Sequence, residues 1–233
     1  MIMSIEDNIA RIRENICRAA QSAHRNPDDV TLMAVTKNRT IDEILQAIDC
    51  GITVIGENRA QELVSKYDTL HGLCDMQFIG HLQSNKINSI IDKVSMVQSL
   101  DSRRLAFALE NKVAQLNQEL NVLVQVNTGA EESKTGFLFD EVSGFLDEAS
   151  SFPHLKIRGL MAVLPVDHGK KKESEAFFDK MFQLFVDMKT KKADNINMGI
   201  LSMGMSNDYE LAVAHGSNLV RVGSEIFGPR NYI

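Results

Sequence analysis

The run NVLVQVN at residues 121–127 decides the fold class, because its central residues are apolar almost throughout instead of alternating with polar ones. A strand with this pattern is buried on both faces, as the strands of parallel sheets are. Similar short runs, each ending in polar residues or glycine, occur at residues 30–37, 53–58, 76–81, 95–101, 156–165, 196–204 and 218–228. Together the eight runs predict eight parallel strands.

Helical patterns separate these runs. The clearest covers residues 171–192, where Phe178, Met181, Phe185 and other apolar residues keep helical spacing against a charged face. A further helix, over residues 4–23, starts with Ser4 followed three residues later by Asp7, which resembles a capping box. The alternation of strands and helices predicts a single (β/α)8 barrel with an extra N-terminal helix.

An open, doubly wound α/β sheet is the alternative architecture. It is disfavoured because no GxGxxG motif follows the first predicted strand. We find no linker-like stretch and no shift in composition, so we expect one domain spanning residues 1–233. Only residues 229–233 follow Gly228, and we therefore expect no second domain.

The composition excludes several classes of protein. The 25 Lys and Arg are outnumbered by 31 Asp and Glu, and a net charge of −6 disfavours a nucleic-acid binder. No apolar run approaches the roughly 18 residues of a membrane span, and the charged amino terminus does not resemble a signal peptide. The cysteines are three, widely spaced and without a CxxC motif, which indicates reduced thiols and no zinc site. We expect a cytoplasmic protein without a metal.

The polar residues that close the predicted strands should meet at one rim of the barrel, where barrel enzymes place their sites. These residues are Lys37, Asn58, His81, Asp101, Asn127, Ser202, Ser206, Gly223 and Ser224. A lysine at a barrel mouth is poorly solvated, which lowers its pKa and favours the neutral amine that forms a Schiff base with a carbonyl. A strand-ending lysine that simply reaches water is the other interpretation of Lys37.

The segment SMGMSNDYELAVAHGSNLVRVGSEIFGPR, residues 202–230, contains a second candidate site. Barrels commonly bind phosphate with the loops after the seventh and eighth strands. Gly204 and Gly223 allow the backbone to approach an anion, while Ser206 and Ser224 supply hydroxyl donors. Ordinary turns and helix caps would explain the same residues. In GHLQSNK, residues 80–86, we expect Ser84 to cap a helix.

Several motifs together carry a resemblance to a known family. They are AVTKN (34–38), IGENRAQE (55–62), FIGHLQSNK (78–86), QVNTGAEESKTGF (125–137), RGLMAV (158–163), SMGMSNDYELAV (202–213) and VRVGSEIFG (220–228). In this order they resemble the pyridoxal phosphate homeostasis protein family, whose fold is similar to the barrel domain of alanine racemase. One departure is Met76-Gln77, where an aromatic residue often precedes FIGH.

The resemblance implies roles for particular residues. Pyridoxal 5′-phosphate would form a Schiff base with Lys37, and its phosphate would bind at Ser206, Gly223 and Ser224. Arg221 and Asn58 would line the cofactor. An amine and a phosphate cup at one barrel mouth are the two anchors that this cofactor requires.

Three functions follow from this reasoning. The resemblance favours a monomeric binding protein without catalytic activity of its own, which holds pyridoxal phosphate and passes it to apo enzymes. An amino-acid racemase is the alternative, but it would need a second base, and none of Tyr67, Tyr209 and Tyr232 lies in a motif that provides one. A class I aldolase-type barrel is a third possibility, in which the phosphate cup would hold a sugar phosphate.

Overall fold

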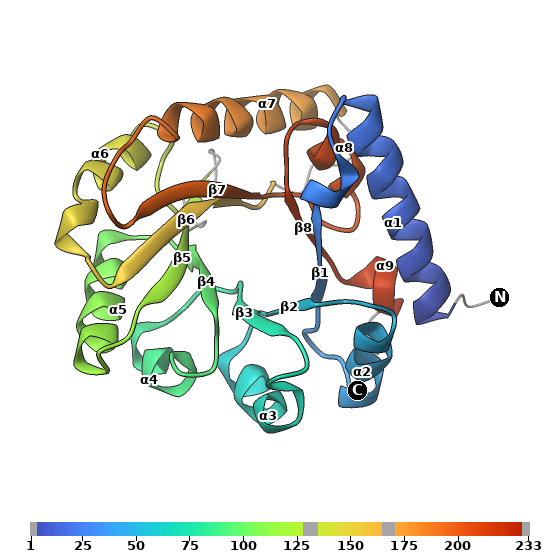
Figure 1. Ribbon diagram of the computed structural model, residues 1–233, viewed down its shortest axis with the longest axis horizontal. Helices are drawn as coiled ribbons and strands as arrows, with labels where there is room; N and C mark the ends of the chain where they lie inside the picture. Colours follow the sequence, from blue (N-terminus) through green and yellow to red (C-terminus); the bar gives the residue numbers. More distant parts are fainter. Residues whose placement is uncertain (1–3, 128–134, 165–170, 230–233) are drawn as a thin grey trace.

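The computed structural model describes residues 4–127, 135–164 and 171–229, and its strands form a closed barrel. Neighbouring strands are parallel throughout, and the last strand pairs with the first (Figure 1). The strands are β1 (Thr31–Val35), β2 (Val54–Glu57), β3 (Asp75–Phe78), β4 (Met96–Leu100), β5 (Leu120–Val126), β6 (Leu155–Ala162), β7 (Ile196–Ser202) and β8 (Leu219–Val222).

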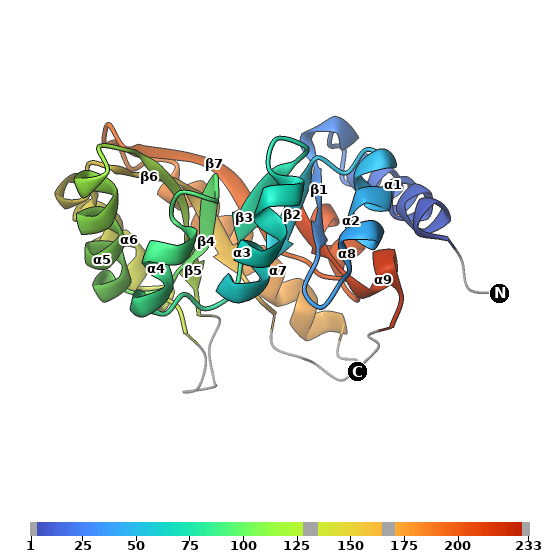
Figure 2. The same cartoon turned by 90° about the horizontal axis from the view of Figure 1, so that it is seen from below.

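The helices lie around this barrel, and all α-helices but the first and the last lie between consecutive strands (Figures 1 and 2). The α-helices are α1 (Ile5–Ser22), α2 (Ile41–Asp49), α3 (Ala60–Leu70), α4 (Ile87–Ile90), α5 (Arg103–Gln115), α6 (Glu141–Asp147), α7 (Lys171–Met188), α8 (Tyr209–Ala214) and α9 (Ser224–Phe227). The 3-10 turns are η1 (Pro27–Asp29), η2 (Ser84–Lys86) and η3 (Ala149–Ser151).

This architecture confirms the predicted (β/α)8 barrel. Each of the eight apolar runs coincides with one strand, although β3, β5 and β6 each begin one residue before the predicted run. Every residue of β4 and β8 is buried, as expected for strands covered on both faces. Pairing between β8 and β1 closes the sheet, so the open doubly wound alternative is wrong.

The extra N-terminal helix is also confirmed. Its capping box forms, because the Asp7 backbone N–H donates to Ser4 Oγ (3.0 Å) and the Asp7 carboxylate accepts from the Ser4 backbone. Ile9, Ile12 and Ile16 recur on one face of α1 and are buried, and the helix packs against α8 and α9. It therefore covers the barrel where the first and last strands meet (Figure 1).

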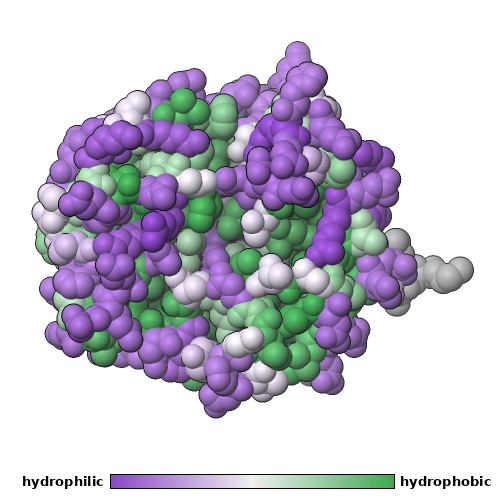
Figure 3. Space-filling view, viewed as in Figure 1, coloured by the Kyte–Doolittle hydropathy of each residue, from purple (hydrophilic) through white to green (hydrophobic). Residues whose placement is uncertain are grey.

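Apolar residues fill the molecule in two layers. The larger cluster lies between strands and helices and includes Ile55, Leu63 and Phe178, whereas Met96, Leu123 and Met161 form a separate cluster inside the barrel. The face in Figure 3 accordingly carries hydrophilic residues over its outer ring and hydrophobic residues toward the centre. No helix within the described residues is long and apolar enough to cross a membrane.

The prediction that Ser84 caps a helix is wrong. Ser84 is the first residue of η2, and Gln83 occupies the cap position without a side-chain capping bond. The chain enters a tight turn here before the short helix α4, so the boundary falls one residue earlier than the sequence pattern suggested.

Candidate active site at the barrel rim

Four of the predicted site residues follow the carboxyl ends of three neighbouring strands: Lys37, Asn58, Gly223 and Ser224. The register pairs Val35 with Gly56 and Ala34 with Val222. Lys37 and Asn58 therefore each lie two residues beyond a paired position, just past the ends of two adjacent strands. Gly223 follows Val222, and a Cβ atom at Gly223 would lie 3.3 Å from the Val35 side chain. The structure thus brings the first, second and eighth strand ends to one side of the rim.

Ser206 reaches the same place from the loop between β7 and α8. Its Oγ accepts a hydrogen bond from the Gly223 backbone N–H at 3.3 Å. Ser224 is the first residue of α9 and is exposed beside this contact. The three residues that the sequence assigned to one cup are therefore neighbours.

Gly204 shapes the loop that carries Ser206. Its φ of +96° is rare for residues with a side chain, and a Cβ atom there would lie 2.6 Å from Ala212 Cβ. The Gly204 carbonyl accepts from the Arg221 backbone N–H at 3.0 Å, which ties the loop to β8. A glycine is thus required for the loop to lie against α8.

Arg221 extends from β8 into the barrel, where it is 4% exposed. Its guanidinium donates to Ser202 Oγ and, at 2.7 Å, to the Ala162 carbonyl at the end of β6. Burial lowers the pKa of Arg221 to about 10, while the nearby Asp208 carboxylate acts to raise it. The guanidinium is therefore still charged at neutral pH and is fixed by the ends of two strands.

A chain of hydrogen bonds continues from Arg221 through the barrel interior. Ser202 Oγ donates to Gln98 Oε1, Gln98 Nε2 donates to Gln77 Oε1, and Gln77 Nε2 donates to Asp75 Oδ2, each at 2.7 Å. Every group donates in the same direction, from the buried cation toward the carboxylate at the amino end of β3. Aligned bonds of this kind polarise one another, so the chain stabilises the charge of Arg221 from within the barrel.

Asn58 carries a buried acceptor without a donor. Its Oδ1 atom is shielded from solvent and accepts no hydrogen bond from any described residue. A cavity of about 150 Å³ opens beside it, lined by residues that include Arg59, His81 and Lys86. A buried polar atom without a partner is unfavourable unless a ligand or water provides one.

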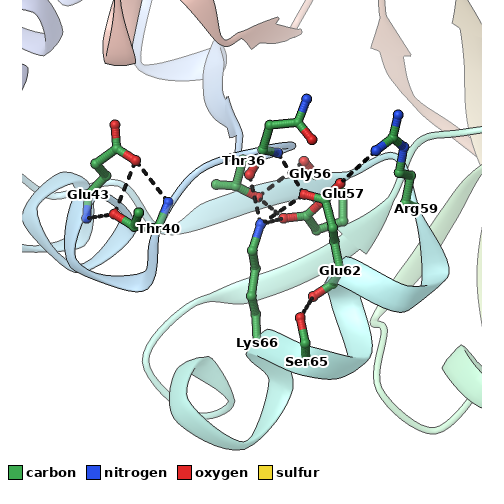
Figure 4. Close-up of polar contacts among 10 residues, drawn as sticks. Thr36, Thr40, Glu43, Gly56, Glu57, Arg59, Glu62, Ser65 and Lys66 are labelled. Atoms are coloured by element: carbon green, nitrogen blue, oxygen red, sulfur yellow. Dashed lines mark hydrogen bonds and ion pairs between the residues drawn. The ribbon is translucent and has the colours of Figure 1, made fainter. Parts of the chain in front are cut away.

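The residues flanking Lys37 are held by a polar cluster that the sequence analysis missed (Figure 4). It consists of Thr36 from the β1 end, Glu57 from β2, and Glu62 and Lys66 from α3. Burial raises the pKa of Glu57, although Lys66 and Thr36 both act to lower it. The i,i+4 spacing of Glu62 and Lys66 was visible in the sequence, but it equally describes an exposed helical pair.

The remaining rim residues form separate contacts. His81 Nδ1 lies 2.8 Å from Asp101 Oδ2, which links the ends of the third and fourth strands. The Asn127 backbone N–H donates to the Phe137 carbonyl at 2.8 Å. Within the described residues no group of three or more His, Cys, Asp or Glu side chains could hold a metal ion.

Comparison with known proteins places this fold in a defined class. The profile of the family described as alanine racemase, N-terminal domain, matches residues 8–231. An alanine racemase structure from Corynebacterium glutamicum superposes with a TM-score of 0.69 at 16% identity, covering 95% of this chain and 61% of that one. The fold is thus that of the alanine racemase barrel domain.

Relatives of full length define the family more narrowly. The pyridoxal phosphate homeostasis protein of Haemophilus influenzae is 38% identical, covering 99% of this chain and 98% of the relative. Its Escherichia coli K12 counterpart is 35% identical, covering 98% and 97%. The structure of PipY from Synechococcus elongatus with PLP bound has a TM-score of 0.83 at 29% identity, covering 97% of this chain and all of that one. The chain belongs to the pyridoxal phosphate homeostasis protein family.

Proposed function

We propose that this protein binds pyridoxal 5′-phosphate as a Schiff base on Lys37 and serves in the intracellular homeostasis and carriage of that cofactor. The observation that carries the proposal is the position of Lys37 just past the end of β1, beside the end of β8, where Gly223 contacts Ser206. One anchor can take an aldehyde and the other can take a phosphate. The structure of PipY with PLP bound supports the binding of this cofactor.

The described residues fit such a ligand. The buried Oδ1 atom of Asn58 needs a donor, and the phenolic hydroxyl of the cofactor could supply one. Ser206, Ser224 and the Gly223 backbone would hold the phosphate, since hydroxyl and N–H groups are the donors that phosphate oxygens accept from. Bound pyridoxal phosphate supplies an electron-withdrawing ring, which the protein can strengthen or weaken.

Arg221 would weaken the withdrawal of electrons by the cofactor ring. A guanidinium has no acceptor, so it cannot accept a hydrogen bond from a protonated ring nitrogen. If the ring nitrogen lay beside Arg221, the ring would stay unprotonated and would withdraw electrons poorly. This supports a protein that stores and passes on the cofactor, not a transaminase.

The positions of two tyrosines also disfavour a racemase. The Tyr209 ring is buried, and its hydroxyl accepts from Asn15 of α1 at 2.8 Å, on the outer layer of the barrel. Tyr67 stacks on His71 at the end of α3. Tyr232 lies outside the described residues. The Tyr209 hydroxyl is thus hydrogen-bonded to α1, and the Tyr67 ring packs at a helix end, so neither position favours a base at the rim.

Titration of cofactor-free protein with pyridoxal phosphate tests the proposal. Wild type should gain a visible absorbance band, and Lys37→Ala should lack the band yet still retain cofactor in equilibrium dialysis through its phosphate. Lys156→Ala is the control, because Lys156 pairs with Glu119 on the surface. Absence of the visible band in saturated wild type would overturn the assignment.

A further inference from the structure

We propose that Lys66, Glu57 and Glu62 form a positioning device that fixes the backbone on both sides of Lys37. This inference rests on the proposed function, in which Lys37 takes the cofactor. The three residues are called the Lys37 clamp below. Figure 4 shows the Lys66 side chain reaching from α3 toward Thr36 and Glu57.

The first half of the clamp holds the peptide unit before Lys37. Lys66 Nζ donates to the Thr36 carbonyl at 2.8 Å and to Glu57 Oε1 at 2.6 Å. Thr36 Oγ1 donates to the same Glu57 oxygen at 2.6 Å. Thr36, Glu57 and Lys66 are 0%, 1% and 6% exposed, so these contacts are made away from solvent.

The second half holds the peptide unit after Lys37. The Asn38 backbone N–H donates to Glu62 Oε2 at 2.6 Å, and Lys66 Nζ lies 3.3 Å from that same oxygen. Asn38 has a φ of +57°, in the left-handed region, which asparagine adopts more readily than most residues with a side chain but which still favours glycine. The hydrogen bond from Asn38 to Glu62 holds the backbone in this conformation.

These contacts determine the direction of Lys37. Peptide units are planar, so fixing the units on either side of one Cα fixes both backbone torsions of that residue. Lys66 holds one unit directly and the other through Glu62. The side chain of Lys37 therefore leaves the backbone in one direction.

Stability alone gives a weak reason for this cluster. A buried ion pair is often no more stable than a well-packed apolar replacement, because charges are costly to remove from water. Here Glu57 and Glu62 share the Lys66 ammonium, and the other oxygen of Glu62, Oε1, has only an ion pair with the Arg59 guanidinium, at 3.6 Å. Glu57 Oε2 is buried without a hydrogen-bond partner among the described residues. A costly arrangement that contacts both peptide units of the proposed binding lysine is better explained by positioning.

The test compares covalent with noncovalent binding in clamp variants. Each protein is incubated with limiting pyridoxal phosphate, and borohydride labelling of Lys37 is measured by peptide mass, while total bound cofactor is measured by dialysis. Lys66→Met should reduce the labelled fraction roughly tenfold or more, since a misplacement of about 1 Å can cost on the order of a hundredfold in reactivity. Total binding should change far less, because the phosphate contacts remain.

Two further variants separate positioning from general damage. Lys66→Arg keeps a cation and donors at the same place and should recover part of the labelling. Glu43→Gln is the matched control, because Glu43 accepts from Thr40 in the same loop at 2.8 Å without contacting either peptide unit of Lys37. It should label like wild type.

The possible outcomes distinguish the two proposals. If wild type is labelled on Lys37 and Lys66→Met is labelled equally, the clamp is wrong and the proposed function stands. If wild type is not labelled, the proposed function fails, and the clamp proposal fails with it. If circular dichroism shows that Lys66→Met does not fold, Glu62→Ala decides by the same labelling, since it removes only the more exposed half. Labelling of Glu62→Ala at the wild-type level would then overturn the clamp.

Discussion

Two ionisable residues near the barrel mouth are largely buried. Arg221 is almost completely buried, and Asp208 lies close enough to influence its pKa. Burial raises the pKa of Asp208 above its ordinary value, although the Met205 backbone N–H and Arg221 act to lower it. The charged form of Asp208 is therefore disfavoured in the folded protein. Asp208 lies in the loop that we assign to phosphate binding.

Asp208→Asn tests this cost through its pH dependence. Near pH 3 the wild-type carboxyl is largely protonated in both states. As the pH rises the unfolded chain ionises first, so the free energy of unfolding of wild type falls until the pH has passed the raised folded pKa. The variant never ionises, and its Oδ1 can still accept from Met205. In urea unfolding, the free energy of unfolding of the variant should exceed that of wild type at pH 7, and the two values should converge in acid. A difference that does not depend on pH would contradict this expectation.

The hydroxyls of Ser206 and Ser224 set the strength of the phosphate anchor. Hydrogen bonds to a charged group contribute roughly 1.5–3 kcal/mol each. Replacing both serines by alanine should therefore weaken pyridoxal phosphate binding by about two to four powers of ten, at ~1.4 kcal/mol for each. Isothermal titration with Lys37 intact measures this. Ser65→Ala, on the outside of α3, is the control, and an unchanged affinity in the double variant would place the phosphate elsewhere.

At the scale of elements, the loop between β7 and α8 positions Ser206 through the backbone of Gly204. Gly204 and Gly72 both have positive φ, but only Gly204 has neighbours where a Cβ atom would lie. Gly72→Ala should lower the free energy of unfolding by about 1–2 kcal/mol, because alanine is strained in the left-handed conformation. Gly204→Ala should lower the free energy of unfolding by roughly 1–3 kcal/mol more, because the added methyl group overpacks the site.

The paired glycine variants also separate stability from binding. The Gly204 carbonyl accepts a hydrogen bond from the Arg221 backbone N–H in β8, so displacement of this loop should weaken cofactor binding. Gly72→Ala should bind the cofactor like wild type. Chemical unfolding and cofactor titration of both variants check the pair. Equal losses of stability would show that the contact with Ala212 is unimportant.

The elements of this fold were largely predictable, and their polar contacts were not. Apolar runs such as VLVQV indicate buried strands on their own, because burial on both faces leaves a local pattern. The Lys37 clamp depends on residues from a strand end and a helix that meet only after the barrel closes. Gln77 and Gln98 stand out as polar residues inside apolar runs, yet their bond to each other requires the barrel register. The proposed roles of the six site residues stay predictions.

At the scale of the whole molecule, the barrel leaves one rim for both anchors, and carriage requires that the cofactor can leave it. Loaded wild type mixed with an apo pyridoxal phosphate enzyme should restore that enzyme's activity, more slowly than Lys37→Ala loaded noncovalently, because the covalent bond must first be hydrolysed or exchanged. Activity of the recipient enzyme over time reports the transfer. If wild type does not release the cofactor to the recipient enzyme within the time of the assay, a resident catalytic cofactor becomes the better explanation.

The central claim is the covalent attachment at Lys37, and one measurement tests it most directly. Protein saturated with pyridoxal phosphate is reduced with borohydride, digested and analysed by peptide mass spectrometry. We predict the pyridoxyl mass on the peptide that contains Lys37, with none on the peptide that contains the buried Lys66. A label on another lysine, or no label in saturated protein, would contradict the account.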